Sequence, residues 1–320
     1  MSTVDGLLAD VDIAEQASSV KRSGRASRIL TGYGRKAGWS GWLFALPALV
    51  MYAVFVLYPV LTSIQYSFYD WDGIGRSTWV GLDNYVSVFT DPRLLSSIGH
   101  AFFLIIFFTV IPVTVALVVA SVVREIKSAF FGAAARTIMF LPQIIPGAAA
   151  AIAWTWMYSP DGVVNQFLTA IGLESWTRAW LGDFTWALPA VGFIGTWVAT
   201  GLCTLLLIAG IGKIDATLYE AADLDGASRF QQFRSVTIPG LKSEIGVCVT
   251  ITIISALASF EVVFMSTQGG PGRATMVPGV EVYQLAFTES QIGLASALAI
   301  VLSILVLAVI LPLQRLFREN

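Results

Sequence analysis

Six long runs of mainly apolar residues constrain this chain more than any other feature of its sequence. A helix needs about 20 such residues to cross the hydrocarbon core of a bilayer. The runs cover Trp42 to Gln65, Ile98 to Val123, Ile138 to Met157, Ala187 to Ile211, Ile245 to Thr267 and Gly293 to Leu313. Only 12% of the residues are charged, far fewer than in a soluble domain. We therefore expect an all-α membrane protein with six transmembrane helices.

The sequence predicts two parts, a polar tail over residues 1–40 and a transmembrane domain over residues 41–320. The tail carries six Lys and Arg residues and no apolar core of a signal peptide, so we expect no cleavage there. Cys203 and Cys248 both lie inside apolar runs and form neither a metal-ligand pattern nor a disulfide framework. We expect both to be small buried residues, and we expect no metal site.

The positive charges predict which side of the membrane each loop occupies. Fifteen of the Lys and Arg residues fall in the tail, in the two loops that follow the second and fourth runs, and after the last run. The intervening loops hold only four. Cytoplasmic loops are enriched in Lys and Arg, so both termini and the loop 212–244 are expected in the cytoplasm.

The loop over residues 212–244 contains two consecutive helix signatures. Capping-box patterns open at Thr217 and at Ser228, where side chains can satisfy the first amides of a helix. Gly226 fits the left-handed position that ends the first helix. The residue before Pro239 is pushed out of helical geometry, which predicts the end of the second helix. We expect two short helices joined by a glycine corner.

On the first of these helices, Leu218, Ala221 and Ala222 share one face, and Glu220 and Asp223 turn away from it. Small alanine side chains allow another surface to approach the backbone closely. Two interpretations remain open on this pattern alone. The face is either a docking site for a partner or the underside of an amphipathic loop helix that covers its own bundle or the membrane.

A resemblance to a known family bears on that choice. Glu220-Ala221-Ala222, then Gly226, then Val236-Thr237-Ile238-Pro239, resembles the EAA motif of ABC-importer permeases, whose pattern ends in Ile-x-Leu-Pro. Further stretches are similar to carbohydrate-importer permeases of the maltose and glycerol-3-phosphate type: Val80 to Tyr85, Asp91-Pro92, Arg136 to Pro142, Trp180 to Asp183 and Gly269 to Gly272. The resemblance implies a type I ABC-importer bundle with a cytoplasmic coupling helix in a bacterial plasma membrane.

The same resemblance implies partners. These are a second homologous permease, two cytosolic ATPase subunits and an extracytoplasmic solute-binding protein, with no nucleic acid. The chain has no phosphate loop, the nearest match being Gly210-Ile211-Gly212-Lys213, so we expect it to be no enzyme and to bind no cofactor itself, with ATP and Mg on the ATPases. By resemblance, ATPase coupling falls to Glu220, Ala221, Ala222, Asp223, Gly226 and Pro239.

The fifth run carries a candidate solute pathway. Thr252, Ser255 and Ser259 recur on one helix face, although small and hydroxylated residues also serve helix packing in membranes. Similarity in position to the maltose permease implies a pathway through Ala199, Leu202, Thr252, Ser255, Ala256 and Ser259. Several of these are small or apolar for a sugar site. Either the partner permease does most of the binding, or this part is mainly a passage.

Glu261 is the one acidic residue within a predicted span. A charged residue at the centre of a transmembrane helix costs about 2.5 to 3.5 kcal/mol on insertion scales, so a wet cavity or a partner is expected beside it. In a continuous helix, Glu261 points away from the Ser259 face, because two residues turn a helix by about 200°. We favour a polar gate or an interface hydrogen bond over a proton relay.

Two other functions share some features of this sequence. An ion-coupled secondary transporter also uses broken helices and intramembrane acids, but it has no need of the polar loop. An intramembrane serine protease is suggested by Gly38-Trp39-Ser40-Gly41 and His100, but the predicted topology puts Ser40 and His100 on opposite sides of a core about 30 Å thick. The solute is expected to be a carbohydrate by resemblance, and its size, from a monosaccharide to an oligosaccharide or glycoside, stays open.

Overall fold

The computed structural model describes residues 40–126 and 128–317, so the predicted tail over residues 1–40 lies almost wholly outside the described residues. The contacts between residues divide the chain into two units, one ending at Leu61 and one running from Thr62 to Asn320. Each unit is described by itself below. The functional residues predicted from the sequence all belong to the second unit.

The described part of the first unit, residues 40–61, is helical. It contains α2 (Ser40–Tyr52), a π-helical segment (Ala53–Leu57) and the start of α3 (Tyr58–Tyr66). Together they form a candidate span over Trp42–Tyr66, and none of the side chains in its most apolar stretch is buried. Phe44 is 87% exposed and Phe55 is 68% exposed. A helix with apolar residues all round is suited to lipid, so this exposure is consistent with a membrane-spanning segment.

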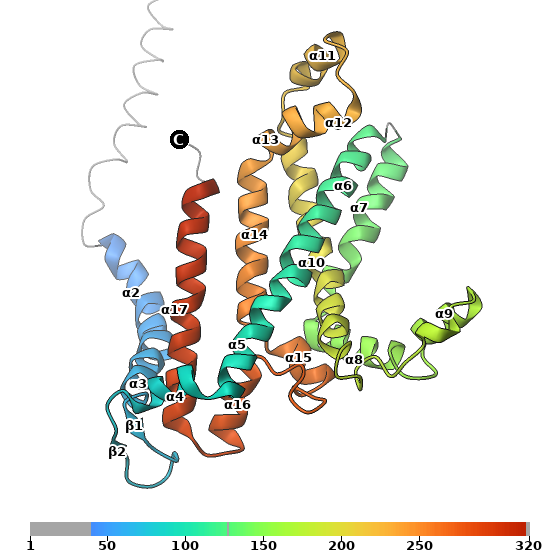
Figure 1. Cartoon of the computed structure of the whole chain (residues 1–320). Helices are drawn as coiled ribbons and strands as arrows, with labels where there is room; N and C mark the ends of the chain where they lie inside the picture. Colours follow the sequence, from blue (N-terminus) through green and yellow to red (C-terminus); the bar gives the residue numbers. More distant parts are fainter. Residues whose placement is uncertain (1–39, 127, 318–320) are drawn as a thin grey trace, which may run out of the picture. The chain divides into compact units, whose positions relative to one another are not determined.

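The second unit is mainly helical (Figure 1). Its short hairpin pairs β1 (Tyr69–Asp70) with β2 (Thr78–Trp79), and Tyr69 lies opposite Trp79. The helices up to the loop are α4 (Asp83–Thr90), α5 (Pro92–Ile105), α6 (Ile111–Glu125), α7 (Ala129–Ile144), α8 (Gly147–Met157), α9 (Val163–Ala170) and α10 (Ala187–Ile211). The later helices are α11 (Ala216–Leu224), α12 (Arg229–Gln232), α13 (Ile238–Gly240), α14 (Lys242–Leu257), α15 (Glu261–Ser266), α16 (Pro278–Phe287) and α17 (Ile292–Phe317).

Four unbroken helices of the described chain have the length and apolarity of a membrane span, over Trp42–Tyr66, Pro92–Glu125, Ala187–Ile211 and Ile292–Phe317. Two bent helix pairs also pass this test, which gives up to six spans if each pair crosses the membrane once. The first pair joins α7 to α8 at an angle of 96°. The second joins the helical stretch Arg229–Gly240 to α14 at 71°. The predicted all-α membrane class is confirmed, whereas the third predicted run is not one straight helix.

The break in the third run has a proline as its cause. Ile145 is extended, with φ −78° and ψ 124°, and Pro146 follows it. A residue before proline avoids helical geometry, so α7 ends and α8 begins beyond Pro146. The fifth run is also broken, because α14 ends at Leu257 and the next helix begins only at Glu261. The prediction of one continuous helix from Ile245 to Thr267 was therefore wrong.

Other prolines do not break their helices. Each of the three π-helical segments (Ala53–Leu57, Ile106–Val110 and Phe233–Thr237) ends two residues before a proline. A proline lacks an amide hydrogen and crowds the carbonyl four residues earlier, which lies inside the π segment in every case. The wider π turn gives that carbonyl room. The second loop helix therefore continues through Pro239 to Gly240, and the prediction that it ends before Pro239 was wrong.

Helices α6, α10 and α14 run side by side in Figure 1 and share one apolar cluster. Ala116 and Ala120 come from α6, Cys203 and Leu207 from α10, and Cys248 from α14. Both cysteines are fully buried and free, as the sequence predicted. Small residues allow membrane helices to approach closely, and this cluster joins the three helices near the loop 212–244.

A glycine contact at the start of α17 gives a test of this packing. A Cβ atom at Gly293 would clash with the carbonyl oxygen of Tyr69, a backbone atom that cannot turn aside. We expect Gly293→Ala to lower the free energy of unfolding by about 1 to 3 kcal/mol, as for other overpacked sites. Thermal unfolding of the protein purified in detergent measures the change.

Gly99→Ala is the matched control. Gly99 is also helical, and a Cβ atom there meets no atom within 4 Å. Because alanine favours the helix by about 1 kcal/mol over glycine, Gly99→Ala is expected to leave stability unchanged or raised. Equal losses in the two variants would contradict the assigned clash at Tyr69.

Candidate functional site

A cavity of about 560 Å³ lies between two helix breaks, the one that separates α7 from α8 and the one that separates α14 from α15. Phe108 belongs to the π segment before α6, and Gln143, Ile145, Pro146 and Gly147 come from the break between α7 and α8. The other lining residues come from α10, from α14 and from the break after α14: Gly195, Val198, Ala199, Leu202, Ile251, Thr252, Ser255 and Ala258 to Val262. The cavity wall therefore combines apolar side chains with a few hydroxyl, amide and carboxylate groups.

Six of the seven predicted pathway residues line this cavity: Ala199, Leu202, Thr252, Ser255, Ser259 and Glu261. The exception is Ala256, which is fully buried in an apolar cluster with Leu104 and Val191. Successive residues of a helix point about 100° apart, so Ala256 turns from the cavity although Ser255 faces it. Sequence reasoning missed Gln143 and Gly147, for which Pro142 and Pro146 were the available signal.

The hydroxyl groups that line the cavity differ in whether they already have a hydrogen-bond partner. Thr252 donates to the carbonyl of Cys248 at 2.8 Å, and Ser255 donates to that of Ile251 at 3.0 Å. The hydroxyl of Ser259 is buried and has no hydrogen-bond partner among the described residues. A buried polar atom without a partner is uncommon. Ser259 is therefore the cavity hydroxyl with a free capacity to bind a polar group.

The side chain of Glu261 lies beside the first residues of α8, which is distant in the sequence. Its Oε1 atom accepts a hydrogen bond of 2.7 Å from the backbone amide of Ala148. The first amides of a helix have no partners within the helix, and the dipole of the helix favours a negative charge there. Glu261 is also the first residue of α15, so one carboxylate stands at the N-termini of two half-helices. It is the only charged residue that lines the cavity.

The predicted orientation of Glu261 was wrong. Residues 258–260 leave the helix, and Phe260 has φ −137°. The turn of about 200° between Ser259 and Glu261 holds only within a continuous helix. With the helix interrupted, both side chains reach the same cavity. The hydrogen bond to Ala148 agrees with the favoured interpretation of Glu261 as a hydrogen-bonding residue.

The loop over residues 212–244 folds as a helix, a corner and a second helix. Asp215 rather than Thr217 caps α11, because its carboxylate accepts from the amide of Thr217 at 2.9 Å. This contact lowers the pKa of the exposed Asp215 carboxyl. Gly226 has φ +72°, the left-handed conformation predicted for the corner. Ser228 and Gln231 form the predicted capping box in both directions.

The face of α11 predicted for docking is largely open. Leu218 is 54% exposed, Ala221 is exposed and Ala222 is half-buried. The side chain of α11 that is buried in this chain is that of Tyr219. An open alanine face does not cover its own bundle, which leaves docking to a partner protein or contact with the membrane.

Two further predicted coupling residues have structural neighbours of their own. The carboxylate of Asp223 accepts from the buried amide of Gln232 at 2.6 Å, which links α11 to α12 across the corner. Pro239 lies in the last helical turn before α14. Glu220 is exposed beside Ala221. The loop therefore presents Glu220 and Ala221 outward, and Asp223, which is also exposed, joins α11 to α12 through the buried Gln232.

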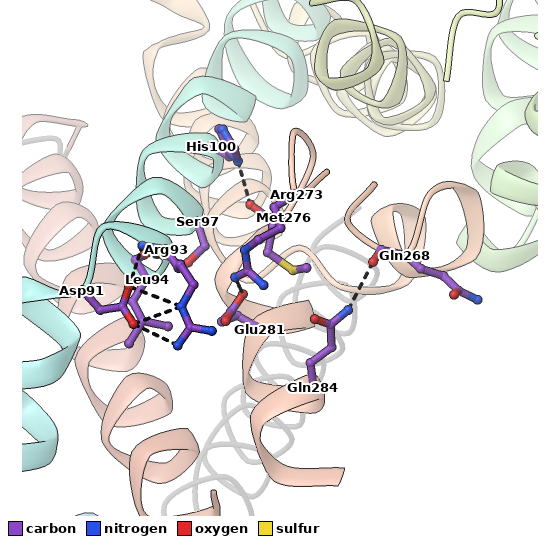
Figure 2. A network of polar contacts seen from close by, with 10 residues as sticks. All are labelled: Asp91, Arg93, Leu94, Ser97, His100, Gln268, Arg273, Met276, Glu281 and Gln284. Carbon is purple, nitrogen blue, oxygen red and sulfur yellow. Dashed lines mark hydrogen bonds and ion pairs between the residues drawn. The ribbon is translucent and has the colours of Figure 1, made fainter. Parts of the chain in front are cut away.

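The other end of the molecule carries a charged network between α5, α16 and the loop before α16 (Figure 2). Arg273 forms an ion pair with Glu281, which is fully buried on α16. Asp91 pairs with Arg93 at 3.0 Å, and this contact lowers the pKa of Asp91. Burial raises the pKa of Glu281 above its ordinary value, and the nearby Arg273 opposes part of that rise.

Two other hydrogen bonds fix the same loop. The Nδ1 atom of His100 lies 2.8 Å from the carbonyl oxygen of Met276, and Gln284 donates to the carbonyl of Gln268 at 3.3 Å (Figure 2). The ring of His100, which the protease pattern suggests as a catalytic base, thus contacts the backbone of the loop before α16. Among residues 40–126 and 128–317, no three His, Cys, Asp or Glu residues gather as a metal site.

The contact between Glu261 and α8 is testable with a double-mutant cycle. An alanine at Gly147 would place its Cβ atom 2.9 Å from Oε2 of Glu261 and move the carboxylate from Ala148. We expect Gly147→Ala and Glu261→Leu each to lower the free energy of unfolding by about 1 to 2 kcal/mol, as loss of a helix cap does. Thermal unfolding in detergent measures both.

The stability losses of Gly147→Ala and Glu261→Leu should not add in the double variant, because both changes break the same hydrogen bond between Glu261 and Ala148. Glu261→Gln keeps an acceptor oxygen and is expected to lose less. Ser255→Ala, another exposed cavity position, is the control and should change stability by no more than about 0.5 kcal/mol. Additive losses in the double variant would show that the bond to Ala148 contributes nothing.

The raised pKa of Glu281 gives a prediction of pH dependence. A raised pKa means that the folded protein holds this proton more tightly than the unfolded chain. The stability from Glu281 is then fully present below the ordinary pKa of 4.5 and is lost as pH rises through the raised value. We expect the Tm of the wild-type protein, relative to Glu281→Gln, to increase as pH falls from about 7.5 to about 5.

Thermal unfolding of both proteins over this range is the measurement, and other titrating groups cancel in the difference. A relative Tm that decreases with falling pH would mean that the ion pair with Arg273 outweighs burial.

Comparison with known proteins identifies the family. The family model described as "Binding-protein-dependent transport system inner membrane component" matches residues 113–318. The probable ABC transporter permease protein YurN of Bacillus subtilis is 36% identical, with 87% of this chain and 96% of the relative covered. The diacetylchitobiose uptake system permease protein NgcF of Streptomyces coelicolor is 34% identical, with 80% and 75% covered.

A solved structure agrees with these relatives. A chain of a bacterial ABC transporter involved in the import of the acidic polysaccharide alginate matches with a TM-score of 0.75 and 25% identity, covering 91% of this chain and 98% of its own. The broken helices, the cavity between them and the loop with Glu220-Ala221-Ala222 thus occur in a chain that belongs to the family of binding-protein-dependent transport system inner membrane components, the permeases of ABC importers.

Proposed function

We propose that this chain is one permease half of an ATP-driven importer that carries a carbohydrate across a bacterial plasma membrane. The observation that carries the proposal is the open alanine face of α11, where Ala221 is exposed beside Glu220 on a loop that the chain itself leaves uncovered. A small-residue face next to a carboxylate suits the groove of another protein. The names of the relatives, among them uptake systems for diacetylchitobiose and lactose, support a carbohydrate solute.

The proposed assembly contains a second homologous permease, two cytosolic ATPase subunits and an extracytoplasmic solute-binding protein. The chain has no phosphate-loop sequence, so ATP and Mg belong to the ATPases. In this arrangement Glu220, Ala221 and Ala222 contact the ATPase, and Gly226 sets the angle between α11 and α12. Closure of the ATPases around ATP moves α11 and changes access to the cavity.

The charge distribution sets the proposed orientation. Fifteen Lys and Arg residues fall on the side of the loop 212–244 and four on the other. By the positive-inside rule, this loop and both termini are cytoplasmic. The buried network around Glu281 then faces the outside, where the binding protein delivers the solute.

The cavity suits a solute rich in hydroxyl groups, bound by two permeases together. Gln143, Ser259 and Glu261 offer donors and acceptors, and Phe108 and Phe260 offer apolar faces to a sugar ring. Most of the lining is nonetheless apolar, so the second permease supplies many of the polar contacts. We assign the passage to Ala199, Leu202, Thr252, Ser255, Ser259 and Glu261.

The coupling loop is tested by two substitutions. We expect Glu220→Lys, which reverses a charge beside the docking face, and Gly226→Pro, which cannot adopt φ +72°, to reduce solute uptake by at least about tenfold, while the protein still inserts in the membrane. Uptake by cells, the amount of protein in the membrane fraction and co-purification of the ATPase are the measurements.

Glu174→Lys is the control, since Glu174 is exposed on the other side of the membrane in the proposed orientation. It should leave uptake and ATPase binding unchanged. Uptake that persists without any ATPase and follows an ion gradient would reject the importer in favour of a secondary transporter.

A further inference from the structure

Tyr219 connects the docking helix to the rest of the chain. It is only 3% exposed, whereas its neighbours Leu218 and Glu220 are exposed. No other side chain of α11 is buried, so this ring is the firm attachment of a helix that otherwise presents an open surface. A force applied to the open face must reach the membrane helices through this attachment, through the hydrogen bond between Asp223 and Gln232, or through the backbone at the ends of α11.

The Tyr219 ring lies against the end of α6. The guanidinium carbon of Arg124, in the last turn of α6, is 3.2 Å from the centroid of the ring. A planar guanidinium stacks on an aromatic face and attracts it electrostatically, most strongly where water is excluded. Because α6 shares its apolar cluster with α10, movement of the ring is passed to a helix that lines the cavity.

The hydroxyl of the same tyrosine lies against the segment that leads into α14. It is 3.0 Å from the hydroxyl of Thr237, which is itself buried and ends the π-helical segment Phe233–Thr237. The carbonyl of Thr237 accepts from the amide of Leu241, directly before α14. Thr252 and Ser255 of the cavity lie on α14. One side chain therefore touches α6 directly and is linked to α14 through Thr237 and Leu241.

We propose that Tyr219 is a positioning residue that transmits movement of α11 to α6 through Arg124 and to α14 through Thr237. This inference rests on the proposed docking of an ATPase on α11. Tyr219 itself faces inward, away from the docking face, so the proposal separates two steps. The open face binds the ATPase, and the buried ring passes on its movement.

A second polar contact between the loop and α6 is an exposed ion pair. Arg229 and Glu125 form an ion pair at 3.3 Å, with 69% and 48% of the two side chains exposed. Exposed ion pairs contribute little, because water and salt screen them. Glu125 adjoins Arg124, so removing this pair provides a control at the same end of α6 that leaves the tyrosine ring in place.

The experiment uses the complete importer reconstituted in liposomes with its ATPase and its solute-loaded binding protein. The variants are Tyr219→Leu, Arg124→Gln, Tyr219→Phe and the control Glu125→Gln. We expect Tyr219→Leu and Arg124→Gln to bind the ATPase as the wild type does and to hydrolyse ATP, while the solute moved per ATP falls by about tenfold, within the range seen for residues that couple distant sites.

Tyr219→Phe keeps the ring on Arg124 and loses only the hydroxyl, so solute moved per ATP should stay several-fold above that of Tyr219→Leu. Glu125→Gln should behave as the wild type. An unchanged ratio in Tyr219→Leu, or loss of ATPase binding by that variant, would overturn the role assigned to Tyr219. Equal losses in the Phe and Leu variants would overturn the role of the stacked ring. A wild-type chain that binds no ATPase would instead overturn the proposed function.

Discussion

The bond between Glu261 and the start of α8 is the interaction on which the cavity depends. Backbone amides have no water to bind within a bilayer, so a broken helix persists there only if its free groups find partners inside the protein. The break at Pro146 frees the first amides of α8, and the carboxylate of Glu261 accepts from Ala148. The same carboxylate opens α15. One side chain thus stabilises both half-helices and adds a charge to the space between them.

Prolines act differently at the two kinds of site. Pro146 follows an extended residue and divides the third run. Pro112 and Pro239 follow π-helical segments, and the helix continues past both. The π turn accommodates the crowded carbonyl, so a long helix runs from Pro92 to Glu125. Because α5 and α6 remain one rod, Arg124 at one end stands on the same rigid element as Phe108 in the cavity.

The sequence was sufficient where a single physical pattern decides the structure. Residues Ala187 to Ile211 were predicted as a span and form α10 with the same bounds, because the run is uniformly apolar. Gly226 was placed in its left-handed corner for an equally local reason. The break after Leu257 had no such signal, since residues 258–260 contain neither glycine nor proline. The residue that accommodates this break is distant in the sequence. Gly279 leaves room for the Ser259 carbonyl, because a Cβ atom at Gly279 would lie 2.7 Å from that oxygen.

The unpredicted break after Leu257 explains which residues of the cavity could be predicted from the sequence. Six pathway residues line the cavity because their places on α10 and α14 follow from helical periodicity. The direction of Glu261 was missed because periodicity ends at the break. Ala256 was misplaced for the opposite reason: it obeys the periodicity and so faces the apolar cluster. Asp215 was overlooked as the cap of α11 because the Thr217 pattern also fits a capping box, and only the position of the first turn distinguishes them.

The breaks also divide the molecule by how movement can pass through it. Next to the loop 212–244, α6, α10 and α14 share an apolar cluster in which Cys203 and Cys248 are fully buried, and this packing favours movement of the three helices together. Beyond the cavity, α8 and α15 are separated from α7 and α14 by non-helical residues. In the proposed transport cycle, a displacement of the loop would therefore carry Thr252 and Ser255 with α14 and be taken up at residues 258–260. The proposal thus places the change of access to the cavity beside Ser259 and Glu261.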